Sequence, residues 1–177
     1  ADVVIAVGAD ASITPLVFAG FCSLRALSSE FNDAPERASR PFDRRRDGFV
    51  MGEGAAALIV ESLAHAKKRK ARVYAEIAGY AATSEAYHMV IPQEDGQEIS
   101  MTMKIGLESA GIGADQVDYI NAHATSTTIG DAVETKAIRN LFKNRADKIA
   151  INATKSLVGH TLGAAGAIGA VATTMAI

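Results

Sequence analysis

Two segments of the sequence carry side chains that could do chemistry, and each directly follows a hydrophobic run. The first, NAHATSTTIGD at residues 121–131, holds His123 and several hydroxyl groups. The second, NATKSLVGH, holds Lys155 and, five residues later, His160. A neutral imidazole can donate a hydrogen bond to a carbonyl oxygen on which negative charge develops, and a nearby ammonium or carboxylate sets its tautomer and charge. The two histidines and the lysine therefore suit an enolate or oxyanion intermediate, but they supply no nucleophile.

The elements around these segments are expected to alternate between strand and helix. β-Branched and apolar runs predict strands, and apolar residues at helical spacing with Pro, Gly or acidic residues near the ends predict helices. The expected strands are residues 2–10, 49–62, 72–83, 117–123 and 149–156, and the expected helices are residues 15–27, 63–70, 97–111, 130–142 and 163–177. The alternation predicts a layered α/β architecture, with the first strand buried. The polar residues 28–48 are expected to form a surface connection.

In layered α/β sheets, ligands bind beyond the carboxyl ends of strands. His123 and His160 each follow an expected strand, so the two histidines are expected to share a site. The alternative for either histidine alone is a structural role in a turn. The pair together with Lys155, in two similar strand-to-turn contexts, favours a functional site.

The remaining reactive side chains are weaker candidates. Cys22, the only cysteine, lies within an expected helix among apolar neighbours, and we expect it to be a small buried packing residue. A reactive thiol prefers a helix N-terminus or a cationic neighbour, and the sequence shows neither there. His65 is expected to be solvated on a basic helix, and His88 to be structural. With one cysteine and no HxxxH or HxH spacing, no metal site is expected.

Composition limits the classes of partner. A net charge of −2 gives no general attraction to nucleic acid or to an anionic membrane. The apolar tail is too short and too rich in glycine to span a bilayer. A single cysteine favours a reducing compartment. The first residues look like a strand without a lead-in and the last like a helix without a cap, so we expect a piece of a longer protein.

The two polar segments, NAHATSTTIGD and NATKSLVGHTLGAAGA, resemble the paired histidine motifs of the β-ketoacyl-acyl carrier protein synthases, elongating condensing enzymes of the thiolase superfamily. The stretches VGADASITPLVFAGFCSLRALSS, ERASRPFDRRRDGFVMGEGAAALIVES and RVYAEIAGYAATSEAYHM resemble the same family in the same order. The resemblance covers essentially the whole chain. It implies a thiolase-like, layered αβαβα fold built from two similar halves, of which residues 1–48 would be the tail of the first and residues 49–177 a truncated second half.

The resemblance also implies a reaction, a ping-pong decarboxylative Claisen condensation in fatty acid elongation. An acyl group from acyl carrier protein is held as a cysteine thioester, malonyl-carrier protein loses carbon dioxide, and the resulting carbanion attacks the acyl group. By position, His123 and His160 would be the two histidines that stabilise the enolate. Lys155 would tune both histidines electrostatically.

Other residues of the two motifs would support this reaction. Thr125 and Thr127 match threonines that bind the phosphopantetheine arm of the carrier protein. Glu134 matches an acidic residue that supports the catalytic residues without contacting the substrate. Asp131 would begin the following helix and support the same site. No metal and no dissociable cofactor are implied, because the substrates are carried on the phosphopantetheine of acyl carrier protein.

The sequence departs from the family pattern in three places. The family's nucleophilic cysteine lies upstream of the strand that opens this chain, and Cys22 does not align with it. The family's C-terminal glycine-rich loop is also outside the sequence. Gly169 stands where the family usually has a glutamate, so the electrostatic environment of Lys155 would differ. The 177 residues alone are therefore expected to be inactive.

Two alternatives stay open beside the fatty acid enzyme: a non-catalytic synthase-like partner subunit and the ketosynthase of a polyketide synthase. The retained histidines and lysine favour an enzyme. The family implies a homodimer, with a location in the cytoplasm or, in a eukaryote, in the mitochondrial or plastid matrix. Because carrier proteins are acidic, the clusters Arg44–Arg46 and Lys67–Lys70 could attract one, although a solvated loop explains them equally well.

Overall fold

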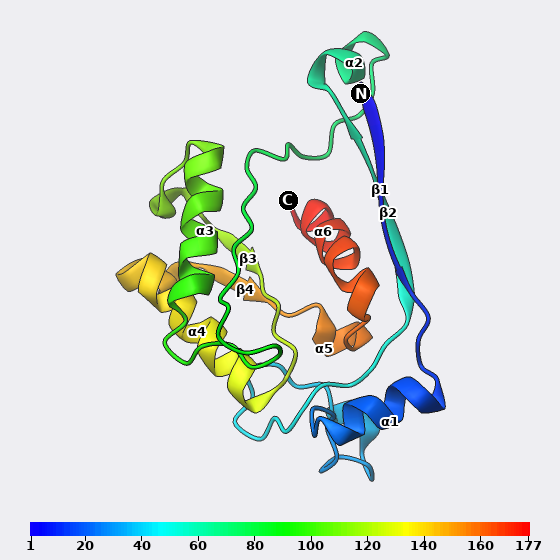
Figure 1. Ribbon diagram of the computed structural model, residues 1–177. Coiled ribbons are helices and arrows are strands. Elements are labelled where there is room, and N and C mark those ends of the chain that lie inside the picture. The colour runs from blue at the N-terminus through cyan, green and yellow to red at the C-terminus, as the bar shows by residue number, and fades with distance from the viewer.

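The computed structural model describes all residues 1–177, and Figure 1 shows how the elements are arranged. The strands are β1 (Val3–Asp10), β2 (Gly54–Glu61), β3 (Tyr119–Asn121) and β4 (Ala150–Asn152). The helices are α1 (Pro15–Ser23), α2 (Leu63–Lys68), α3 (Gln97–Ala110), α4 (Thr128–Phe142), α5 (Lys155–Val158) and α6 (Ala165–Ala176), with four short 3-10 turns between them. Every expected helix is present, and the predicted alternation holds except at residues 72–83 and at α5, which includes the end of the strand expected at residues 149–156.

The strands form two separate pairs. β1 and β2 are antiparallel, in a register that runs from Val3 opposite Glu61 to Asp10 opposite Gly54. β3 and β4 are parallel, so the carboxyl ends of both strands lie at the same edge. Helix α6 lies between the two pairs and packs on β1 and β2 (Figure 1). Its close approach depends on Gly8, where an added Cβ would lie 2.9 Å from the Ala167 side chain.

The prediction that the first strand is buried is wrong for the chain described. Ile5 and Val7 of β1 are each 65% exposed. The continuous apolar run is typical of a strand covered on both faces. Within these residues α6 and the short 3-10 turn Leu162–Ala164 are the main elements packed against the β1–β2 pair, so much of the apolar surface of β1 has no covering layer.

The strand predicted at residues 72–83 is also not formed. The segment runs alongside α3 (Figure 1) and contacts that helix, with the backbone N–H of Tyr80 donating to Ser109 Oγ at 3.4 Å. Thr83 and Thr102 are joined by a hydrogen bond between their hydroxyl groups. A strand needs a neighbour to complete its ladder of hydrogen bonds, and no strand of the chain pairs with this segment.

The largest buried cluster holds α4 in place. Ile138, Phe142, Ala146 and Ile149 form this core, and side chains from α3 and Ile120 of β3 pack against it. The apolar residues of α4 recur at helical spacing, so one face of the helix is buried while the other faces solvent. Packing on this face fixes where the N-terminal end of α4 lies, within the first histidine segment.

Candidate active site

The two histidine segments meet at one edge of the β3–β4 pair. His123 lies two residues beyond the end of β3, and Lys155 lies three residues beyond the end of β4, at the start of α5. The chain then turns and brings His160 back toward His123. The two imidazole rings are 5.4 Å apart between centroids and nearly perpendicular, at 87°. The structure therefore brings the two histidines together, as the argument from strand ends predicts.

The backbone and the ring of His160 are both held by hydrogen bonds. Its N–H donates to Val50 O at 2.7 Å, and its carbonyl accepts from Gly52 N at 3.0 Å. An added Cβ on Gly52 would lie 2.3 Å from Val158 O, so only glycine allows the backbone at residue 52 to lie this close to residue 158. The N–H of Leu162 donates to Nδ1 of His160 at 3.2 Å. Because Nδ1 accepts, the proton of the neutral ring is on Nε2, which is left to act as a donor.

The backbone of His123 is held by Glu134. One carboxylate oxygen of Glu134 accepts from the N–H of His123 and the other from the N–H of Ala124, each at 2.7 Å. Hydrogen bonds to a charged acceptor are stronger than neutral ones. Ala124 is fully buried and has a φ of 36°, which is costly for a residue with a Cβ. The Glu134 carboxylate, on α4, thus holds the loop between β3 and α4 (residues 122–127, the histidine loop) in an otherwise unfavourable conformation.

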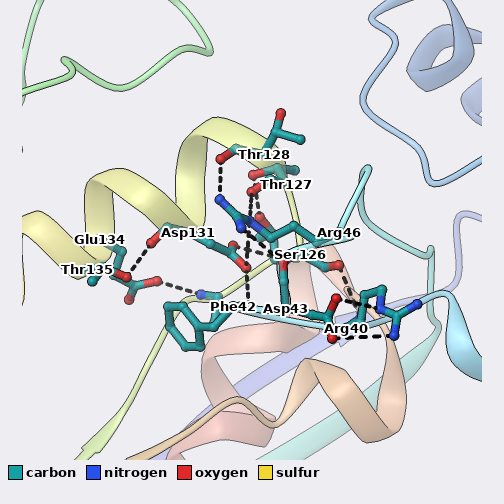
Figure 2. Close-up of polar contacts among 12 residues, drawn as sticks. Arg40, Phe42, Asp43, Arg46, Ser126, Thr127, Thr128, Asp131, Glu134 and Thr135 are labelled. Atoms are coloured by element: carbon teal, nitrogen blue, oxygen red, sulfur yellow. Dashed lines mark hydrogen bonds and ion pairs between the residues drawn. The ribbon is translucent and has the colours of Figure 1, made fainter.

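The threonines and Asp131 lie on the same loop. The hydroxyls of Thr125 and Thr127 are 3.0 Å apart. The Asp131 carboxylate is only 1% exposed and accepts from the N–H of Ser126 at 3.0 Å and of Phe42 at 2.8 Å (Figure 2). Burial raises the pKa of Asp131, although the donated hydrogen bond from Phe42 and the charge of Arg46 oppose this.

Burial and nearby charges, that of Lys155 among them, shift the pKa values of this site. Burial lowers its pKa, while the carboxylates of Glu134 and Asp131 oppose that change. Burial by surrounding protein atoms and the charge of Lys155 together lower the pKa of His123, a residue that nonetheless keeps an exposed surface. The pKa of His160 falls to about 4, because of burial first, then of Lys155 and His123. Both imidazoles are therefore neutral near pH 7.

The structure adds residues that the sequence did not single out. Phe49 is 5% exposed, and its ring centroid lies 5.4 Å from that of His160. Residues 28–48 are more than a surface connection, because the end of this segment is half-buried against the histidine loop. Ser39 Oγ, for example, donates to the carbonyl of Lys155 at 2.5 Å. Many of these contacts are made by backbone N–H groups, which carry no signature in the sequence.

The other candidates lie elsewhere. Cys22 is exposed on α1, so the prediction of a buried packing residue is wrong; α1 contains no buried residue and contributes little to a core. The Nδ1 atom of His65 is hydrogen-bonded to the Glu61 carboxylate at 2.7 Å, so the ring is not simply solvated. The ring of His88 accepts hydrogen bonds from the backbone of Val90 and Ile91.

No group of three or more His, Cys, Asp or Glu side chains is arranged to hold a metal ion. None of the helices combines the length and the apolar character needed to cross a bilayer.

Two family models match the chain. A family model described as the beta-ketoacyl synthase C-terminal domain matches residues 74–177, and the model of the N-terminal domain matches residues 1–66. The chain belongs to the β-ketoacyl synthase family. Both histidine segments and Lys155 fall within the match to the C-terminal domain.

Curated members of the β-ketoacyl synthase family are similar along the whole chain. The 3-oxoacyl-[acyl-carrier-protein] synthase 2 of Coxiella burnetii is 51% identical over 177 residues, which are 100% of this chain and 42% of that protein. The chloroplastic 3-oxoacyl-[acyl-carrier-protein] synthase I of Arabidopsis thaliana is 52% identical over 177 residues, which are 100% of this chain and 37% of that protein. The chain therefore spans about two fifths of the length of such relatives.

A solved ketosynthase has the same fold. The ketosynthase of a type II PKS, bound to the hexaketide and in complex with its acyl-carrier protein, superposes with a TM-score of 0.98 at 42% identity, over 100% of this chain and 43% of its own. The thiolase-like α/β fold expected from the resemblance is confirmed, for the part of the fold that the chain spans.

Proposed function

We propose that the protein of which these residues form part is a β-ketoacyl-acyl carrier protein synthase of fatty acid elongation. The observation that carries the proposal is the pair of neutral imidazoles, 5.4 Å apart, beside a buried lysine in a chain of this family. Relatives named 3-oxoacyl-[acyl-carrier-protein] synthase support the same assignment. The division of the chain at residue 48 into the two thiolase-like halves stays a prediction.

The reaction would use the histidines as hydrogen-bond donors. The neutral rings of His123 and His160 donate to the carbonyl oxygen of a malonyl thioester. The bond to the carboxylate carbon breaks, carbon dioxide leaves, and its electron pair forms the enolate that the two rings stabilise. The enolate carbon then attacks the acyl thioester of a cysteine, and the cysteine thiolate is the leaving group. That cysteine would lie in a part of the protein outside these 177 residues.

Lys155 and the loop residues would prepare the site. The ammonium of Lys155 disfavours the doubly protonated, cationic form of both rings. A neutral ring is a much weaker acid than an imidazolium, so it can donate a hydrogen bond to the enolate without readily protonating it. Thr125 and Thr127 would bind the phosphopantetheine arm, which their adjacent hydroxyls support. Glu134 and Asp131 would hold the loop that carries these groups, through the hydrogen bonds they accept from its backbone.

The expected partners are acyl carrier protein and a second copy of the chain. A related ketosynthase solved in complex with its acyl-carrier protein supports the first. Arg44 and Arg45 are exposed and would attract an acidic carrier, whereas Arg46 is directed inward. Relatives named mitochondrial and chloroplastic, beside bacterial ones, support an organellar matrix or the bacterial cytoplasm as the location.

The test uses the full-length protein with malonyl- and acyl-carrier protein. We expect carbon dioxide release and one β-ketoacyl product, and His123→Ala or His160→Ala should remove decarboxylation while the cysteine can still accept an acyl group. A wild-type protein that releases no carbon dioxide, or variants that keep the wild-type rate, would exclude the proposal.

A second candidate is a polyketide ketosynthase, which the TM-score of 0.98 to a type II PKS ketosynthase favours. The same assay separates the two. A single β-ketoacyl product, elongated once, supports fatty acid synthesis, and a poly-β-keto chain elongated several times supports polyketide synthesis. A non-catalytic partner subunit would form neither product.

A further inference from the structure

The segment of residues 39–48, here called the arginine segment, is joined by hydrogen bonds to both histidine segments. Besides the contact of Ser39 with Lys155, the N–H of Arg40 donates to Ser126 Oγ at 3.1 Å. The N–H of Gly48 donates to the carbonyl of Ser126 at 3.1 Å. Residues about 80 positions apart in the sequence thus share one network (Figure 2).

Arg46 is the side chain at the centre of this network. Its Nε donates to the carbonyl of Thr127 at 2.9 Å, and one terminal nitrogen donates to the carbonyl of Thr128 at 2.5 Å. The other terminal nitrogen donates to the carbonyl of Asp43 at 3.0 Å. Nε also lies 3.7 Å from the buried carboxylate of Asp131. Figure 2 shows the guanidinium inserted between the loop and its own segment.

The three consecutive arginines therefore differ in role. The side chain of Arg46 is 16% exposed, whereas that of Arg45 is 64% exposed and Arg44 is an exposed residue. A planar guanidinium can donate in several fixed directions at once, and an ammonium on a flexible stem cannot reproduce that geometry. Of the three arginines, Arg46 is the one whose guanidinium donates hydrogen bonds to the loop that carries Thr125 and Thr127.

The loop needs such support because its own conformation is unfavourable. Ala124 and Ser126 both have positive φ, 36° and 72°, and both are fully buried. Conformations of this kind persist only where the surroundings fix them. Ser126 is held from every side, by Asp131 at its N–H, by Arg40 at its hydroxyl and by Gly48 at its carbonyl. Arg46 fixes the two residues that follow.

We propose that Arg46 is a positioning residue that holds the Thr125–Thr127 hydroxyl pair in place for the phosphopantetheine arm of the carrier-bound substrate. This inference rests on the proposed function. Arg46 touches neither histidine ring and acts through the backbone carbonyls of Thr127 and Thr128. Its loss would change how well the arm is held, in ground state and transition state alike, while the histidines and Lys155 keep their arrangement.

Loss of an interaction that is equally strong in the ground state and the transition state raises KM and leaves kcat nearly unchanged. In the full-length enzyme, Arg46→Gln should therefore raise KM for malonyl-carrier protein about tenfold and change kcat by less than about threefold. Arg46→Lys keeps a charge near Asp131 and should recover most of the melting temperature. It should leave KM raised, because the single nitrogen of an ammonium cannot reach the three carbonyls that three guanidinium nitrogens contact.

A matched control comes from α4. Arg139 is also an arginine paired with a carboxylate, Asp147, at 2.9 Å, and it contacts none of the loop residues. Arg139→Gln should leave KM and kcat unchanged. A double-mutant cycle adds a readout that loss of stability alone would not move. If Arg46 acts through the hydroxyl pair, the effects of Arg46→Gln and Thr127→Val on KM will be less than multiplicative.

Specific outcomes would overturn the inference. An unchanged KM in Arg46→Gln, full recovery of KM in Arg46→Lys, or effects that simply multiply in the double variant would each exclude a positioning role. These results presuppose a wild-type enzyme that condenses. A wild-type protein without condensation activity would instead refute the proposed function, so the two failures are distinguishable.

Discussion

The backbone N–H of Leu162 donates a hydrogen bond to Nδ1 of His160, with 3.2 Å between the two nitrogens. This contact decides the tautomer of the neutral ring, so that Nε2 carries the proton. Leu162 makes it from a φ of 43°, a conformation that costs a residue with a side chain about 1–2 kcal/mol. The next N–H, of Gly163, donates to the Asp10 carboxylate at 3.1 Å and helps to keep the turn in place.

The charge of Lys155 should extend activity to lower pH. In Lys155→Met the positive charge that lowers the pKa of both histidines is removed. We expect the acidic limb of the kcat/KM profile to move to higher pH. It should stay below 6.5, the ordinary histidine value, because burial is the larger cause of the low pKa of His160. The profile of the full-length enzyme with carrier-bound substrates checks this. An unmoved limb would show that Lys155 does not act on the rings.

Asp10 should act on His160 in the opposite direction. Its carboxylate raises the pKa of His160 slightly, and it accepts hydrogen bonds from Gly163 and Ser12. Asp10→Asn keeps an acceptor for Gly163 but removes the charge. The pKa of His160 should then fall further below its wild-type value of about 4. NMR titration of the imidazole resonances measures this directly, and a pKa that rises in Asp10→Asn would contradict the assignment.

Protonation of His160 should also weaken the fold. The pKa of His160 is about 4 in the folded protein and roughly 6.5 when unfolded. Between these values the unfolded chain binds more protons, so the free energy of unfolding rises with pH through this window and falls on acidification. Urea titrations of the full-length protein at several pH values should show a smaller slope in His160→Gln. Equal slopes in the two proteins would mean that other groups cause the pH dependence.

Glu134 should stabilise the histidine loop through its charge. In Glu134→Gln one of the two backbone N–H groups, of His123 or Ala124, faces an amide NH2 instead of an oxygen. We expect the free energy of unfolding to fall by about 1–3 kcal/mol and kcat to fall with it. Glu108→Gln is a matched control, because its pairing with Lys104 is exposed and should contribute less than about 0.5 kcal/mol. Similar losses in the two variants would remove the special role of Glu134.

Ala124 should tolerate glycine but no larger residue. Glycine relieves the cost of the positive φ but gives the unfolded chain more freedom, so Ala124→Gly should change the free energy of unfolding by less than about 1 kcal/mol. Ala124 is fully buried, and a β-branched residue at this φ adds overpacking to backbone strain. Ala124→Val should therefore cost about 3 kcal/mol or more. Denaturant midpoints measure both, and equal losses would show that φ is not what limits this position.

Several elements of the fold were predictable because their signals are local. The apolar spacing of residues 97–111 and 130–142 predicted α3 and α4, and the end of α3 at Gly111 follows from its left-handed conformation, with a φ of 68°. The segment of residues 72–83 has the same kind of local signal for a strand. It forms none, because strand formation needs a partner that no local pattern supplies.

The sequence by itself determined which residues could do the chemistry. His123, Lys155 and His160 follow the strands β3 and β4, whose parallel pairing places both strand ends at one edge. Tertiary structure alone decided the 5.4 Å between the rings, the Nε2 proton of His160 and the inward direction of Arg46. The physical reason is that these features depend on backbone N–H and C=O groups of distant segments. Every residue carries a carbonyl and nearly every residue an N–H, so only the folded chain determines which of them meet.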